Sequence, residues 1–310
     1  MMMVVGGIDA GGTATKCLLL DGAGNTLFAH QGQPANYQVG PDEAAKAIKA
    51  TLAAAMAGAG IDRVELLGVG LAGAGRKPEL ERMKACLGTL EGVNRYALTD
   101  DGEIAVLGAH RGQPGVVLIA GTGSIAYGLR QDGTMIRNGG WGAILGDEGS
   151  GYWIGLKAVQ AVIRAEEGRG QQTVLSTAVC RGLGIDSLTA LPALVYNSSL
   201  GRKEIAALVP TVVQTAADGD LVAAAIIDAA VHELALLVEM VQKLMDFPRA
   251  KVAVSGGLFA NPLFMAAFTE RLAEASGSTP VKPSHPPVVG AVIYGARQSG
   301  WPLPFLELKQ

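Results

Sequence analysis

The strongest constraint on the fold is a repeat, because the chain carries the same short pattern twice. In the first copy, Ile8 precedes a glycine turn, a second strand and an Asp-Gly turn at Asp21. In the second copy, Ile119 and Asp132 occupy the same places at the same spacing. Two unrelated hairpins would also give this spacing by coincidence, since Asp-Gly turns are common. The repeat predicts a chain built from two similar halves.

Strand signals alternate with helical ones around the repeat, which predicts an α/β fold. We expect domains at 1–113 and 114–310, with the last helix, at 288–300, a candidate to pack on the first domain. The first domain is expected to hold strands at 4–9, 16–21, 25–30, 63–73 and 95–100, and helices from Pro41 to about Gly58, near 77–87, and from about Gly102 to Arg111.

Composition excludes several classes of protein. Of the 310 residues, 49% are apolar and the formal net charge is −3, which favours a soluble globular protein without a basic surface for nucleic acid or anionic membranes. The three cysteines are odd in number and far apart, which argues against a disulfide framework or a clustered metal site, so we expect reduced thiols and a cytoplasmic location. The apolar stretch 221–241 includes acidic residues and predicts a buried helix rather than a membrane span.

The two glycine turns suit phosphate binding. Neither "DAGGTATK" nor "AGTGSIA" fits the common nucleotide-binding fingerprints. Backbone N–H groups beside Thr13 and Ser124, which coincide in the repeat, would still cradle phosphate oxygens, and two turns facing across a cleft would hold a polyphosphate from both sides. Asp9, where the second copy has Ala120, would orient a hydrated magnesium ion through its waters.

The segment 139–155, "GGWGAILGDEGSGYWIG", is unusually rich in glycine. Glycine lets the backbone approach a ligand closely, while Trp141, Tyr152 and Trp153 supply flat aromatic walls. Trp153 falls within a helix expected from about Ser150, so we assign it a structural role. The segment predicts a binding surface.

In order and spacing, five segments resemble the N-acetylglucosamine kinase branch of the actin/hexokinase-like ATPases and the wider BadF/BadG group. They are "GIDAGGTATK", "TDDGEIAVLGA", "GVVLIAGTGSIAYG", "GGWGAILGDEGSGYWIG" and "VAVSGGLFAN", and the resemblance covers about 4–300. It implies two ribonuclease-H-like (actin/hexokinase-type) α/β domains with a ligand cleft between them. It also implies ATP-dependent phosphorylation of an amino sugar, N-acetylglucosamine or glucosamine, with Mg²⁺.

The resemblance also implies site residues. Those that would bind ATP are Gly11, Gly12, Thr13, Lys16, Gly121, Thr122, Gly123, Ser124, Gly256 and Gly257, the last two in the adenosine motif. Those that would bind the sugar are Asn36, Asp101, Gly140, Trp141, Gly142, Asp147 and Glu148.

Some of these positions have simpler interpretations. Asp147 and Glu148 directly precede a predicted helix and would complement its positive end without any sugar. Asn36 taken alone is typical of a turn.

The catalytic base must accept the proton of the sugar hydroxyl, which a carboxylate does well. Asp100 and Asp101 are candidates at the end of a strand. In related sugar kinases the base stands seven residues before the glycine of a Leu-Gly pair, and here Gly108 selects Asp101. Asp100 would then be a neighbour or a helix cap.

Two kinds of function stay open. The first is a cytoplasmic kinase that makes an amino-sugar 6-phosphate, and the second is a non-catalytic sensor of nucleotide or sugar. Asp9 and Asp101 favour the kinase, because a sensor needs no base. Cysteine clusters typical of zinc-containing ROK kinases and iron–sulfur dehydratase activators are missing. The resemblance allows a homodimer and does not fix the substituent on the sugar.

Overall fold

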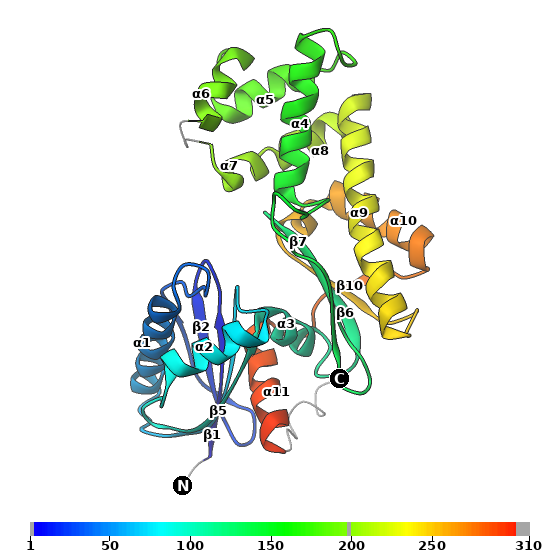
Figure 1. Ribbon diagram of the computed structural model, residues 1–310. Helices are drawn as coiled ribbons and strands as arrows, with labels where there is room; N and C mark the ends of the chain where they lie inside the picture. The colour runs from blue at the N-terminus through cyan, green and yellow to red at the C-terminus, as the bar shows by residue number, and fades with distance from the viewer. Residues whose placement is uncertain (1–2, 197–199, 302–310) are drawn as a thin grey trace. The chain divides into compact units, whose positions relative to one another are not determined.

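The protein is described by a computed structural model that covers residues 3–196 and 200–301 (Figure 1). Two compact units make up this range. Unit 1 contains the described residues up to Pro114 and those from Pro283 onward, and unit 2 runs from Gly115 to Lys282. The last described helix therefore belongs to unit 1.

Each unit combines one sheet with several helices. The strands are β1 (Val4–Ala10), β2 (Thr15–Asp21), β3 (Thr26–Gly32), β4 (Val64–Leu71), β5 (Val93–Asp100), β6 (Gly115–Ala120), β7 (Ser124–Leu129), β8 (Met135–Gly139), β9 (Val252–Ser255) and β10 (Pro280–Val281). The α-helices are α1 (Pro41–Ala59), α2 (Lys77–Leu87), α3 (Asp101–Ala109), α4 (Gly151–Glu166), α5 (Leu175–Leu183), α6 (Leu191–Tyr196), α7 (Arg202–Ala206), α8 (Val209–Ala217), α9 (Leu221–Met245), α10 (Pro262–Ser276) and α11 (Pro287–Ser299). Short 3₁₀ turns lie at η1 (Leu188–Ala190) and η2 (Gly257–Ala260).

The sheet of unit 1 has the order β3-β2-β1-β4-β5. Its first three strands are antiparallel, and β4 and β5 run parallel to β1. The turn after β2 forms where expected, because Asp21 Oδ1 accepts hydrogen bonds from the backbone N–H groups of Ala23 and Asn25. Such side-chain bonds stabilise a tight turn locally.

Helices cover both faces of this sheet. Val4 and Ile8 of β1 pack in a core with Ile48 of α1, whereas Val5 packs with Val292 of α11. Since successive strand residues point to opposite faces, α1 and α11 lie on opposite sides of the sheet.

Glycine allows α11 to lie against the strands. A Cβ atom on Gly68 of β4 would lie 1.8 Å from the carbonyl oxygen of Ala291, and one on Gly7 of β1 would lie 2.3 Å from that of Val288. Backbone therefore meets backbone at this contact, and any side chain would push the helix away.

The sheet of unit 2 repeats the topology of unit 1. Its order, β8-β7-β6-β9-β10, matches β3-β2-β1-β4-β5 strand for strand, with three antiparallel strands followed by two parallel ones. Asp132 Oδ1 accepts the backbone N–H of Thr134 at 2.9 Å, in the place that Asp21 has in unit 1. The predicted internal duplication is confirmed.

Helix α9 is the core helix of unit 2. It has the length and apolar composition of a membrane span. Its buried residues, which include Ala230, Leu234 and Val238, belong to the core cluster of this unit, and the helix contacts β7, β8, α8 and α10 (Figure 1). The sequence prediction of a buried helix at 221–241 agrees with this packing.

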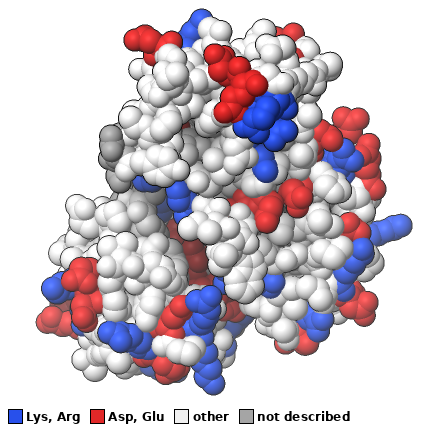
Figure 2. All heavy atoms as spheres, turned by 45° about the horizontal axis from the view of Figure 1, so that its top comes forward, with Lys and Arg blue, Asp and Glu red and all other residues white. Residues whose placement is uncertain are grey.

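Charged side chains of both signs are interspersed on the face that Figure 2 shows. This agrees with the small formal net charge of −3.

Candidate functional site

The first glycine turn follows β1 in unit 1. The Gly11 N–H donates to the carbonyl of Ala14 at 3.1 Å, and Thr13 is exposed at the tip. Asp9 and Lys16 face each other across the antiparallel pair of β1 and β2. Burial raises the pKa of the Asp9 carboxyl, and the Lys16 ammonium partly offsets this shift.

Asn36 lies beside this turn. The neighbouring Ala35 N–H donates to the Gly11 carbonyl at 3.0 Å, which ties the loop to the turn. Asn36 Oδ1 accepts the Gln38 N–H at 2.8 Å, so the side chain also forms the local turn expected of a lone asparagine. Its Nδ2 atom lies 3.4 Å from the Cβ position of Gly12. Asn36 thus stabilises its own loop and presents an amide close to the first turn.

The adjacent acids Asp100 and Asp101 stand where β5 becomes α3. Asp100 is the N-cap, and its Oδ1 accepts the Glu103 N–H at 3.0 Å. Of the two roles expected for Asp100, a neighbour of the base or a helix cap, the structure shows the cap. Asp101 is the first residue of the helix. Burial first, then the negative charges of Asp100 and Asp9, raise the pKa of Asp101 to about 6. A pKa in this range suits a general base near neutral pH.

The second glycine turn joins β6 to β7 in unit 2. Gly121 N–H donates to the Gly123 carbonyl at 2.9 Å and closes the turn. The first N–H groups of α4 hold the turn. The Gly151 N–H donates to the Gly121 carbonyl at 2.7 Å, and the Tyr152 N–H donates to the Thr122 carbonyl at 3.3 Å. The helix N-terminus thereby fixes the conformation of the predicted phosphate turn.

The predicted adenosine motif adjoins this turn, because β6 and β9 are parallel neighbours whose carboxyl ends meet at one edge. Gly256 has a φ of 106°, and a Cβ there would lie 2.2 Å from the Ala120 carbonyl oxygen. The Cβ position of Gly121 is 3.8 Å from the Gly257 nitrogen. Only glycine fits this approach at position 256.

Asp147 connects the glycine-rich segment to the second turn. It is 5% exposed and has a φ of 57°, a conformation that is uncommon outside glycine and often found at functional sites. Its Oδ1 accepts the Gly142 N–H at 3.1 Å, and its Oδ2 lies 3.0 Å from Arg202 Nη2. Oδ2 is also 2.7 Å from the Cβ position of Gly123.

The other predicted sugar residues lie around the same turn. Ser124 Oγ donates to the Glu148 carbonyl at 2.7 Å, and the Gly140 N–H donates to the Ser124 carbonyl at 3.0 Å. The side chain of Glu148 is exposed, and Trp141 is 65% exposed. Trp153 instead packs against the core of unit 2, in agreement with its structural assignment.

The predicted residues fall into one group in each unit. The group in unit 1 comprises Asp9, Gly11, Gly12, Thr13, Lys16, Asn36 and Asp101. The group in unit 2 comprises Gly121, Thr122, Gly123, Ser124, Gly140, Trp141, Gly142, Asp147, Glu148, Gly256 and Gly257. Ser150 caps α4 by accepting the Trp153 N–H, so the helix does not depend on Asp147 or Glu148 for its cap.

Sequence reasoning missed Arg202. It stands 55 positions from Asp147, and nothing in its own stretch, "LGRKEIAAL", indicates the contact. Sequence patterns reveal contacts through regular spacing, and a single ion pair between distant residues leaves no such pattern.

The donor set for a cation is small. Over 3–196 and 200–301, no group of three or more His, Cys, Asp or Glu residues is placed to hold a metal ion. Asp9 and Asp101 are close enough to influence each other's charge. One or two carboxylates are the usual protein contribution to a magnesium ion that keeps several waters and binds substrate phosphates. The residues present therefore fit hydrated Mg²⁺ and not an all-protein metal cage.

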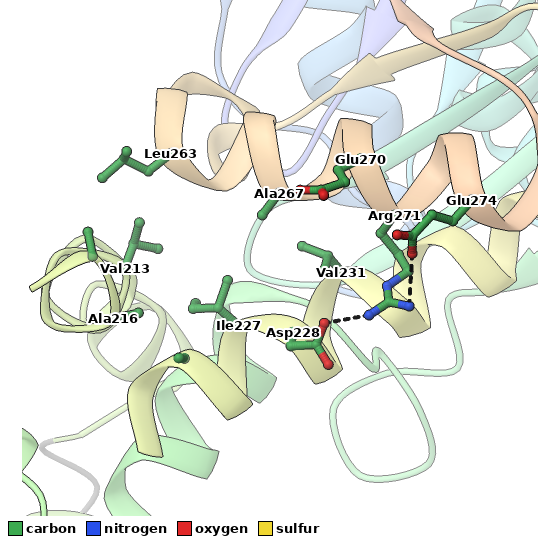
Figure 3. Close-up of a pocket in the computed structure, with 12 residues that line it drawn as sticks. Val213, Ala216, Ile227, Asp228, Val231, Leu263, Ala267, Glu270, Arg271 and Glu274 are labelled. Atoms are coloured by element: carbon green, nitrogen blue, oxygen red, sulfur yellow. Dashed lines mark hydrogen bonds and ion pairs between the residues drawn. The ribbon is translucent and has the colours of Figure 1, made fainter. Parts of the chain in front are cut away.

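A separate groove lies among α8, α9 and α10 (Figure 3). Arg271 of α10 reaches Asp228 of α9 at 2.5 Å and Glu274 at 3.2 Å, while Val213 and Ile227 contribute apolar wall. None of the predicted site residues lines it.

Comparison with protein families gives a match over nearly the whole chain. The model of the "BadF/BadG/BcrA/BcrD ATPase family" matches residues 6–295.

Two curated proteins are similar at the sequence level. The N-acetylmuramic acid/N-acetylglucosamine kinase of Clostridium acetobutylicum is 32% identical over 265 residues, which cover 84% of this chain and 87% of that protein. The N-acetyl-D-glucosamine kinase of Dictyostelium discoideum is 30% identical over 262 residues, which cover 78% of this chain and 80% of that protein.

A solved structure shares the fold. It belongs to a protein of Chromobacterium violaceum provisionally described as an N-acetylglucosamine kinase, with a TM-score of 0.76 and 29% identity, covering 94% of this chain and 98% of that one. The two matching sheets and this likeness confirm the expected fold class of two ribonuclease-H-like α/β domains.

Proposed function

The chain belongs to the BadF/BadG/BcrA/BcrD ATPase family, and from this membership we propose that it transfers the terminal phosphoryl group of ATP to the 6-hydroxyl of an amino sugar. N-acetylglucosamine is the first candidate, because both curated relatives are named as kinases of this sugar. The proposal assigns the two groups of predicted residues to one reaction.

The observation that carries the proposal is the environment of Asp101. Phosphoryl transfer to a sugar needs a group that positions the hydroxyl and accepts its proton. Asp101 is a partly buried carboxylate at a helix start, with a pKa of about 6. It is ionised near neutral pH yet basic enough to take up the proton as the hydroxyl oxygen attacks phosphorus.

The two glycine turns are proposed to hold the phosphates of ATP through backbone N–H groups, with Lys16 adding positive charge beside the first turn. In the same proposal, Gly256 and Gly257 accommodate the adenosine end. Asp9 would hold hydrated Mg²⁺ through its waters, and the ion, when bound, neutralises charge on the transferred phosphoryl group.

The sugar is assigned to residues that surround the two turns. Asn36 offers an amide near the first turn, and Glu148 offers an exposed carboxylate near the second. Trp141 supplies an exposed aromatic face of the kind that sugars stack on. Gly140, Gly142 and Asp147 shape the segment that carries Trp141 and Glu148.

Glucosamine is an alternative substrate, because the proposed contacts bind sugar hydroxyls and do not distinguish an acetylated from a free amino group. A nucleotide- or sugar-sensing protein without turnover is the second candidate function, and the poised carboxylate of Asp101 argues against it. A cytoplasmic location, a homodimer and the lack of nucleic-acid or membrane partners belong to the same proposal.

A coupled assay of ADP release against a panel of sugars tests the proposal. With ATP and Mg²⁺, N-acetylglucosamine or glucosamine should raise ADP release well above the rate without sugar, and glucose, which lacks the nitrogen, serves as the matched control. ATP binding without stimulation by any hexose or amino sugar would leave only the sensor.

A further inference from the structure

Arg202 places a cation at the second phosphate turn. Its Nη2 atom lies 3.6 Å from the Cβ position of Gly123, the last residue of the turn. The residue comes from α7, which is remote in sequence from both the turn and the glycine-rich segment.

Two contacts hold the guanidinium in this place. Nη2 donates to Asp147 Oδ2 at 3.0 Å, and the group lies over the ring of Tyr152, 5.8 Å from its centroid. Both partners border the second turn, since Tyr152 donates its N–H to the Thr122 carbonyl. The position of Arg202 is therefore set by the same residues that shape the predicted phosphate site.

The ion pair is asymmetric in its exposure. The Asp147 side chain is 6% exposed, whereas the Arg202 side chain is 51% exposed. A guanidinium has five N–H donors in a planar fork, so one bond to Asp147 leaves donors for a second, anionic partner.

We propose that Arg202 binds the phosphate chain of the nucleotide at the second glycine turn, with Asp147 and Tyr152 as its positioning residues. The inference rests on the proposed function, because it assigns a further contact to the same ATP site. Charge-assisted bonds from a pre-positioned guanidinium to phosphate oxygens are among the stronger polar contacts in proteins. Arg202 therefore contributes to the affinity for phosphate groups and leaves the adenosine contact unchanged.

Calorimetric titration of ATP, ADP and adenosine into Arg202→Gln tests this role without measuring turnover. Loss of a charged hydrogen bond should weaken ATP binding by about tenfold to a hundredfold, while adenosine binding stays within about twofold of wild type. The ATP affinity of Arg202→Lys should fall between those of wild type and Arg202→Gln, because lysine keeps the positive charge but lacks the planar fork of N–H donors. Lys203→Gln, an exposed neighbour on the same helix, is the matched control and should change neither affinity.

The outcomes separate the hypotheses. Equal loss of ATP and adenosine affinity would reduce Arg202 to a scaffold for Asp147, and unchanged affinities for both ligands would remove it from the phosphate site. Thermal unfolding of each variant checks that the fold is intact, and Arg202→Lys gives the same comparison if Arg202→Gln does not fold. Wild-type protein that bound no ATP at all would overturn the proposed function itself, whereas a failure confined to Arg202 would not.

Discussion

Asp100 and Asp101 are neighbours in the chain, but Asp100 caps the helix that Asp101 begins. The Asp100 Oδ1 atom accepts the Glu103 N–H at 3.0 Å, whereas the partly buried Asp101 carboxyl has its pKa raised to about 6 by burial and by nearby negative charge. A cap needs only a hydrogen-bond acceptor, while a base needs a carboxylate that titrates near the working pH. This difference supports Asp101 as the proposed base.

Substitution by asparagine separates the two acids. Asp101→Asn removes the proton acceptor and should lower turnover by about a hundredfold or more, with ATP binding retained. Asp100→Asn keeps an oxygen that caps the helix equally well, so turnover should change by less than about tenfold. Steady-state kinetics and ATP titration of both variants check this. If Asp100→Asn abolished transfer and Asp101→Asn did not, the base would be Asp100.

The pH profile should report the same carboxyl. A general base works only when it is ionised, so kcat/KM should fall as the pH drops through about 6 and approach a tenfold loss per unit below it. The residual rate of Asp101→Asn should lack this step. A wild-type profile that is flat from about pH 5 to 8, with the protein still folded, would contradict the assignment.

Asp101→Asn, which should lower turnover, should raise the stability of the folded protein at neutral pH. The folded-state pKa of Asp101 lies above its ordinary value of 3.8, so its contribution to the free energy of unfolding is full below pH 3.8 and is lost as the pH rises to about 6. Asp101→Asn does not titrate and so does not lose this contribution. Its free energy of unfolding relative to that of wild type should therefore be higher at neutral than at acidic pH, by on the order of 1–3 kcal/mol. Urea unfolding at both pH values measures this gain. The tested quantity is the difference in free energy of unfolding between Asp101→Asn and wild type. If this difference were the same at neutral as at acidic pH, or smaller, the raised pKa of Asp101 would be refuted.

Local features were predictable from sequence because their causes are local. Pro41 begins α1 as expected, and the helix ends beside Gly60, whose φ of 64° is typical of a helix terminus. Asp21 and Asp132 form their turns with bonds to residues two to four positions away. The duplication was visible for the same reason, since it rests on two hairpins.

Long-range pairing was not predictable. The ion pair of Asp147 with Arg202 depends on how α7 returns to the second turn, and no pattern in either segment encodes it. The last helix was a candidate to pack on the first domain, but its particular contact, between Gly68 and Ala291, has no signal in either segment. Tertiary packing determines both, whereas spacing and propensity describe only neighbours in the chain.

Asp9 provides a test of the metal assignment. If it orients hydrated Mg²⁺, Asp9→Asn should lower turnover and raise the Mg²⁺ concentration required for half-maximal rate by about tenfold. Sugar binding to the nucleotide-free protein should change little. Because the negative charges of Asp9 and Asp100 both raise the pKa of Asp101, Asp100→Asn is the matched control, and its Mg²⁺ titration should be unchanged. An unchanged Mg²⁺ titration would remove Asp9 from the site.

Following the phosphorus itself shows directly whether the protein phosphorylates an amino sugar. Wild-type protein is incubated with ATP, Mg²⁺ and N-acetylglucosamine, and phosphorus NMR follows the products, with Asp101→Asn in parallel. We expect one sugar 6-phosphate for each ADP formed, and almost none with Asp101→Asn. ADP formed together with inorganic phosphate and no sugar phosphate, for both N-acetylglucosamine and glucosamine, would contradict this expectation.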